Sequence, residues 1–76
     1  MESRKIKNFN DFRIWVKIRM IEQGISQNEL AEQMKIARPR ISEATYGKRS
    51  GRKYIIPIIK QLNGNMEDFE EFLKAI

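Results

Sequence analysis

The chain has 76 residues, a net charge of +5 and no cysteine or histidine, and 41% of its residues are hydrophobic. This length allows one domain with a small core, and the hydrophobic fraction argues against an intrinsically disordered chain. Disulfides and thiolate zinc sites need cysteine, and the commonest catalytic base is histidine. Because both residue types are missing, we expect no enzyme, no metal site and no cofactor.

The basic residues are concentrated in the first two thirds of the chain. Residues 1–53 carry 13 Lys and Arg against 6 Asp and Glu, whereas residues 54–76 carry 2 against 4. This asymmetry indicates a polyanionic partner for one part of the molecule, with ordinary surface lysines as the alternative. No stretch resembles a signal peptide or a membrane span, so we expect a cytoplasmic protein without membrane contact.

The sequence predicts an all-α fold of five helices, because apolar residues recur at helical spacing between turn signals. Residues 1–9 are interpreted as a polar N-terminal extension and residues 10–76 as a single domain. The first helix is expected over residues 10–23. Asn10 is its predicted N-cap, and Gly24 suits its C-terminal end.

The second and third helices are separated by a three-residue turn, residues 35–37. Ser26 and Glu29 have the S-x-x-E spacing of a capping box, which starts the second helix. The third helix runs from the turn to about Tyr46 and is closed by a glycine. Two helices joined by so short a turn cross steeply, so their contact needs a small residue, which Ala31 supplies.

Helical periodicity divides this helix pair into an inner and an outer face. The inner, apolar positions are Leu30, Met34, Ile36, Ile41 and Ala44. At 100° per residue the outer face of the third helix holds Pro39, Ser42, Glu43 and Tyr46. Two arginines flank this face at its N-terminal end. Such a face has the width of the DNA major groove, and an ordinary solvated helix face is the alternative.

A fourth helix is predicted around residues 54–62 and a fifth over residues 66–76. Pro57 is tolerated only in a first turn, so the fourth helix either starts near Ile55 or is kinked. Asn65 caps the fifth helix, whose apolar stripe is expected to close the core. The same stripe is the candidate surface for a homodimer across a two-fold axis.

The stretch GISQNELAEQMKIARPRIS, residues 24–42, resembles the helix-turn-helix of the Xre and phage repressor or Cro-like family. In that family a G-[LI]-[ST]-Q-x-E-L-A segment precedes the helix that reads the groove. The resemblance covers roughly residues 12–62. It implies a lambda-repressor-like helix-turn-helix domain with its core at residues 26–46. It also implies a sequence-specific transcriptional regulator, a phage or mobile-element repressor that occupies a double-stranded DNA operator.

The resemblance assigns base reading to the third helix, at Arg38, Pro39, Ser42 and Glu43. Arg38 matches a position that takes guanine O6 and N7, whereas Pro39 has no donor and reaches at most a thymine methyl group. Glu43 either accepts from cytosine N4 or forms an ion pair with one of the two arginines. Arg40 and Tyr46 are expected on a base or a phosphate.

Phosphate contacts are implied for Gln27, at the start of the second helix, with a plain exposed residue as the alternative. The basic segment GKRSGRKY, residues 47–54, resembles the loop that follows the recognition helix in small phage-encoded members of the family. Its cations are expected to neutralise backbone phosphates without reading sequence, through Lys48, Arg49, Arg52 and Lys53.

Two positions depart from the family pattern. Lys35 stands where the turn usually has glycine, and Ala37 stands where a Ser or Thr cap is common. Pro39 partly compensates for the missing cap, since its fixed φ suits a first turn. Two other functions remain open: a protein-interaction module of the antirepressor or antitoxin type, using the acidic last helix, and a DNA-architectural or recombination-directing factor.

Overall fold

The protein is described by a computed structural model over residues 5–76, and all regular structure in these residues is helical. Five α-helices and two 3-10 segments follow one another: α1 (Phe9–Gln23), α2 (Gln27–Met34), α3 (Arg38–Thr45), η1 (Arg49–Tyr54), α4 (Ile55–Gln61), η2 (Met66–Phe69) and α5 (Glu70–Ala75). The prediction of an all-α fold with five helices is confirmed. None of these helices combines the length and the apolar character needed to cross a membrane.

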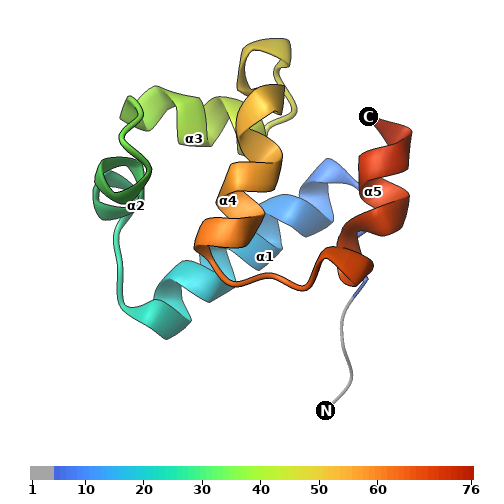
Figure 1. Cartoon of the computed structure of the whole chain (residues 1–76), viewed down its shortest axis with the longest axis horizontal. Coiled ribbons are helices and arrows are strands. Elements are labelled where there is room, and N and C mark those ends of the chain that lie inside the picture. Colours follow the sequence, from blue (N-terminus) through green and yellow to red (C-terminus); the bar gives the residue numbers. More distant parts are fainter. Residues whose placement is uncertain (1–4) are drawn as a thin grey trace.

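In the view of Figure 1, α1 and α4 lie between α2 and α3 on one side and α5 on the other. Their buried side chains form one core. Its fully buried large members are Ile6, Phe12, Leu30, Ile41, Ile55, Ile58, Ile59, Leu62, Phe69 and Phe72. The α2–α3 pair is therefore held against the rest of the chain by its inner face, which leaves its outer face free.

Helix α1 starts earlier than its sequence indicated. The N-cap is Asn8, whose Oδ1 accepts from the backbone N–H of Asp11 at 2.8 Å. The prediction of Asn10 as N-cap is wrong: Asn10 lies inside the first turn, where Phe9 packs edge-on against Phe72 with ring centroids 4.9 Å apart. The contact accompanies the earlier helix start, and helical periodicity does not reveal it.

The segment interpreted as a polar extension contributes to the core. Ile6 is fully buried, and its backbone N–H donates to the carbonyl oxygen of Asp68 at 2.8 Å. The chain just before α1 is thereby tied to η2, near the other end of the sequence. Residues 1–4 of the proposed extension lie outside the described residues.

The capping box at the start of α2 is confirmed. The Ser26 hydroxyl accepts from the N–H of Glu29 at 3.1 Å, and the Glu29 carboxylate accepts from the N–H of Ser26 at 3.2 Å. At the start of α3, Ala37 makes no side-chain cap, and Pro39 lies in the first turn. The first turn of α3 is therefore favoured by the fixed φ of proline rather than by a capping side chain.

The turn between α2 and α3 uses a left-handed lysine. Lys35 has φ 58° and ψ 43°, and its N–H donates to the carbonyl oxygens of Ala31 and Glu32 in the last turn of α2. The next residue, Ile36, donates its N–H to the carbonyl oxygen of Ala31 at 3.0 Å. These bonds close the helix with the pattern that glycine normally serves. Lys35 thus accepts the backbone that its position demands, at a conformational cost.

Replacing Lys35 by glycine is expected to stabilise the fold by about 0.5–1 kcal/mol. Relief of the left-handed strain outweighs the extra freedom that glycine gives the unfolded chain. Urea unfolding followed by circular dichroism measures the difference. The matched control is Lys35→Ala, which removes the charge but keeps the strain, so its stability should equal that of the parent. An equal gain in both variants would assign the effect to charge instead.

The predicted inner face of the helix pair is confirmed. Leu30, Ala31, Ile41 and Ala44 are buried, and Met34 and Ile36 are partly buried against the same core. Helix α4 starts at Ile55 with Pro57 in its first turn, so the first of the two predicted alternatives holds. Asn65 caps the last helical region, as predicted, but that region opens as the 3-10 segment η2 before α5 begins.

The segment expected to be a basic loop forms the 3-10 helix η1, which packs on α3 through Gly51. This glycine is buried, and a Cβ at its position would overlap the backbone nitrogen of Ala44 and the carbonyl carbon of Glu43. The N–H of Lys48 also donates to the carbonyl oxygen of Glu43 at 2.9 Å. The basic segment is therefore fixed to the C-terminal half of α3 by backbone contact.

Candidate nucleic-acid interface

A groove runs along the outer face of α3 toward the start of η1. It is lined by Arg38, Pro39, Ser42, Glu43, Tyr46 and Lys48. The first five belong to α3 or its C-cap, and the hydrogen bond between Lys48 and the Glu43 carbonyl brings in the sixth. Four predicted base-reading residues thus lie together in one groove with a predicted phosphate contact at its edge.

The side chains of this face leave most of their polar groups accessible. Arg38, Pro39 and Tyr46 are exposed, and Ser42 and Glu43 are half-buried. Within residues 5–76, the guanidinium of Arg38 makes only a long hydrogen bond, 3.5 Å from Nη1 to Asn28 Oδ1. Because a guanidinium has five N–H donors, Arg38 retains donors for a planar, two-acceptor partner.

Glu43 is paired with Arg40, which settles which arginine it contacts in the free protein. Arg40 Nη1 lies 2.8 Å from Glu43 Oε1. This hydrogen bond and charge lower the pKa of Glu43 and raise that of Arg40, so both groups are charged at neutral pH. Arg40 itself is not among the residues that line the groove. The pair places one carboxylate in an otherwise basic face.

The remaining predicted phosphate contacts on the basic segment project from η1. Arg49, Arg52 and Lys53 are exposed and lie outside the groove lining. The Lys53 ammonium is 5.3 Å from the centroid of the Tyr54 ring. Because η1 is fixed to α3, these cations form a basic margin beside the groove rather than part of its floor.

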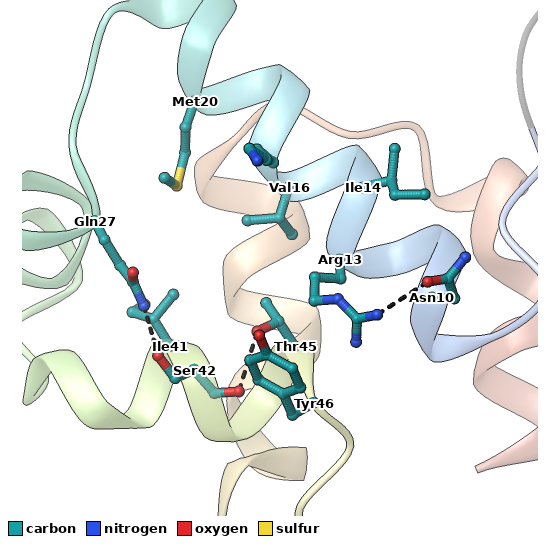
Figure 2. Close-up of a pocket in the computed structure, with 11 residues that line it drawn as sticks. Asn10, Arg13, Ile14, Val16, Met20, Gln27, Ile41, Ser42, Thr45 and Tyr46 are labelled. Carbon is teal, nitrogen blue, oxygen red and sulfur yellow. Dashed lines mark hydrogen bonds between the residues drawn. The ribbon is translucent and has the colours of Figure 1, made fainter.

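Gln27 lies on the other side of α3 from η1. Its Nε2 donates to the Ser42 hydroxyl at 2.8 Å, which joins the start of α2 to the outer face of α3. Gln27 and Ser42 both line a second cleft, between α1 and α3 (Figure 2). The side chain is half-buried, so the alternative of a plain exposed residue does not describe it.

Sequence reasoning missed the cations that α1 brings to this second cleft. Asn10, Arg13 and Lys17 line it together with Ser42 and Tyr46. Their spacing places them on one face of α1, next to the buried Val16, which lines the same cleft. That spacing is visible in the sequence. The neighbourhood of α1 and α3, however, follows only from the packed fold.

The last helix uses its aromatic side chains inside the chain. Phe69 and Phe72 are fully buried, and Phe69 meets Trp15 edge-on at 4.8 Å. Among the large apolar side chains of residues 66–76, Ile76 is the one that is exposed. The acidic side chains Glu67, Glu70 and Glu71 are exposed on η2 and α5, across the α1–α4 pair from α3 (Figure 1). The acidic surface of η2 and α5 therefore lies away from α3.

Comparison of this chain with protein-family models, curated proteins and solved structures gave no match.

Proposed function

We propose that the protein is a sequence-specific double-stranded DNA-binding regulator that inserts α3 into the major groove. In this proposal the domain is of the lambda-repressor-like helix-turn-helix type, as the sequence resemblance implies. Arg38 and Ser42 read base edges, and the cations of η1 hold the backbone. Occupation of an operator by the domain represses transcription, in a bacterial cell or a phage-infected host.

The observation that carries this proposal is the composition of the groove on α3. Its residues combine an uncommitted guanidinium, a hydroxyl, a carboxylate and an aromatic ring, with Lys48 at the edge. Base edges in the major groove present acceptors, donors and thymine methyl groups that such a set matches. The basic margin formed by η1 supplies the sequence-independent attraction.

Glu43 contributes selectivity in two ways. These two ways are alternatives. Either the Glu43 carboxylate accepts a hydrogen bond from cytosine N4, or it holds Arg40 in one orientation through the 2.8 Å ion pair. In both cases a carboxylate in the groove disfavours close approach of phosphate to this point. The face is thereby directed at base edges, and phosphate binding is left to its margins.

The assignment of α3 is tested with Arg38→Ala. A duplex selected from a random pool by the parent protein and a scrambled duplex are titrated with both proteins. The variant is expected to lose about 1–3 kcal/mol on the selected duplex and to discriminate less at one base position. Its affinity for the scrambled duplex should fall much less.

Asn28→Ala is the control, because it removes the partner of Arg38 and leaves the guanidinium in place. It should keep the parent's sequence preference. If Arg38→Ala bound both duplexes as the parent does, the recognition-helix assignment would be wrong.

The rival function as a protein-interaction module has less support in the surface of the last helix. Its phenylalanines are buried within the chain, so its contact surface would consist mainly of exposed carboxylates. A homodimer built through residues 66–76 would likewise rest on Ile76 and polar groups. Failure to bind duplex DNA at low salt would favour the protein-interaction role, since non-specific binding is strongest there.

A further inference from the structure

Helix α1 carries large apolar side chains on two opposite faces. Phe12 and Val16 on the inner face are buried in the core. On the outer face, Ile14, Ile18 and Ile21 are exposed, with 36%, 43% and 71% of their surface accessible. A helix that is apolar on both sides is normally covered on both sides. The structure of residues 5–76 leaves the outer face of α1 open.

The three isoleucines form one stripe along α1. At 100° per residue they lie within about 60° of one another, and they span about 10 Å, or two helical turns. The side chain of Ile14 extends away from α3, whereas that of Arg13 points toward Tyr46 (Figure 2). Positions i, i+4 and i+7 are the anchors through which one helix packs along another surface. The stripe therefore matches the contact surface of one short helix.

The border of the stripe on the side of α3 is positively charged. It consists of Arg13 and Lys17, and neither forms an ion pair within residues 5–76. Arg13 is oriented by neutral groups: its Nη2 donates to Asn10 Oδ1 at 2.9 Å, and its Cζ lies 4.8 Å from the centroid of the Tyr46 ring. These contacts position the guanidinium and leave its charge available to a partner.

The acidic groups on the other border of the stripe are engaged within the chain. Glu22 Oε1 accepts from Arg19 Nη1 at 3.0 Å. Asp11 lies in the first turn of α1, and its Oδ2 accepts from the backbone N–H of Lys7 at 3.2 Å. A partner therefore meets an apolar stripe beside two unpaired cations, which carboxylates complement.

A second copy of this chain has no surface that combines an open apolar stripe with free carboxylates. Its α1 repeats the stripe, but with the same cations beside it. Its η2–α5 region carries the exposed Glu67, Glu70 and Glu71, but Phe69 and Phe72 there are buried. An amphipathic helix of another protein, with Asp or Glu beside its apolar stripe, has both properties.

We propose that the outer face of α1 is a docking surface for an acidic amphipathic helix of another protein. The isoleucine stripe buries the apolar side chains of that helix, and Arg13 and Lys17 bind its carboxylates. None of these five residues lines the groove on α3. The inference therefore does not depend on the proposed DNA-binding function.

The probe is a synthetic, helix-constrained peptide with leucine at positions i, i+4 and i+7 and glutamate beside the leucines. A matched peptide has lysine in place of each glutamate. Backbone amide NMR signals of isotope-labelled protein report both the site and the affinity. The glutamate peptide should shift the signals of residues 13–22, and the lysine peptide should bind there at least about tenfold more weakly.

Ile18→Ser and Ile21→Ser should each weaken binding of the glutamate peptide about tenfold, because each removes apolar area from the contact. The matched control is Ile56→Ser, which changes an isoleucine of α4 that is 42% exposed, against 43% for Ile18. It should bind like the parent. Lys17→Glu should narrow the preference for the glutamate peptide. Circular dichroism checks that each variant is folded.

Binding of neither peptide at millimolar concentration, or equal losses in Ile18→Ser and Ile56→Ser, would overturn the proposal. A parent dimer that Ile18→Ser dissociates in sedimentation equilibrium would overturn it too, since a second copy would then occupy the stripe. Binding of the parent to anionic phospholipid vesicles, abolished by Ile18→Ser, would overturn it in favour of a membrane surface.

Discussion

Replacing Gly51 by alanine is expected to lower the free energy of unfolding by about 3 kcal/mol, at the upper end of overpacking effects. The added methyl group would overlap the backbone of Glu43 and Ala44, with the Ala44 Cα only 2.6 Å away. Backbone atoms cannot rotate aside as a side chain does. Either η1 separates from α3, or the C-terminal half of α3 shifts from the core.

A loss of this size is large for a chain of this length. Total stability is expected near 4–11 kcal/mol, and each kcal/mol shifts Tm by roughly 4–8 °C. Gly51→Ala should therefore unfold about 12–24 °C below the parent in a thermal scan. Because η1 carries the basic margin, affinity for duplex DNA should fall in the same variant at temperatures where it remains folded.

The matched control is Gly24→Ala, which adds the same methyl group at a position with no atom within 4 Å. Gly24 has φ 66°, so this variant incurs only the left-handed strain of about 1 kcal/mol. Comparing the loss in free energy of unfolding between Gly51→Ala and Gly24→Ala separates the effect of the contact between η1 and α3 from that of the added methyl group. Equal losses in the two variants would show that Gly51 has no special packing role.

Neutralising three cations of the basic margin is expected to weaken DNA binding about 500-fold at about 0.1 M salt. The variant combines Arg49→Gln, Arg52→Gln and Lys53→Gln. Each lost phosphate contact lowers the slope of log affinity against log salt by about 0.9, so the slope should fall by about 2.7. Selected and scrambled duplexes should lose affinity equally, in contrast to Arg38→Ala.

The control for this variant carries the same net charge with its changes elsewhere: Lys5→Gln, Lys60→Gln and Lys74→Gln. These lysines are exposed and lie on the N-terminal segment, α4 and α5. If both triple variants lost affinity alike, net charge alone would account for binding, and η1 would have no particular place in the interface. Fluorescence anisotropy with labelled duplexes measures all these slopes.

Much of the fold could be predicted because local signals and burial agree. The capping box at Ser26, the first-turn Pro57 and the inward Ile41 each follow from a rule that acts within one helix. The start of α1 could not be predicted, since Asn8 and Asn10 are equally good caps by residue type. The helix that starts after Asn8 includes Phe9, which packs against a residue more than sixty positions away.

The residues of the groove on α3 could also be predicted from the sequence, because they share one helical face. The contribution of α1 side chains to the cleft beside α3 could not be predicted, since it depends on which helix lies beside α3. Gly51 was also missed: as part of a polar, basic run it resembles a loop glycine, and its need for close backbone contact exists only after α3 and η1 have packed. These features could not be predicted because they depend on contacts between residues far apart in the sequence, and not because the local sequence signals are weak.

The most direct test of α3 as the recognition helix is the change in backbone amide NMR signals when isotope-labelled protein is titrated with selected duplex. The shifts should cluster at Gln27, at residues 38–46 and at residues 47–53, with smaller ones near Arg13. The signals of α5 should stay in place. Shifts centred on α5, or none at low salt, would contradict a DNA-binding role for α3.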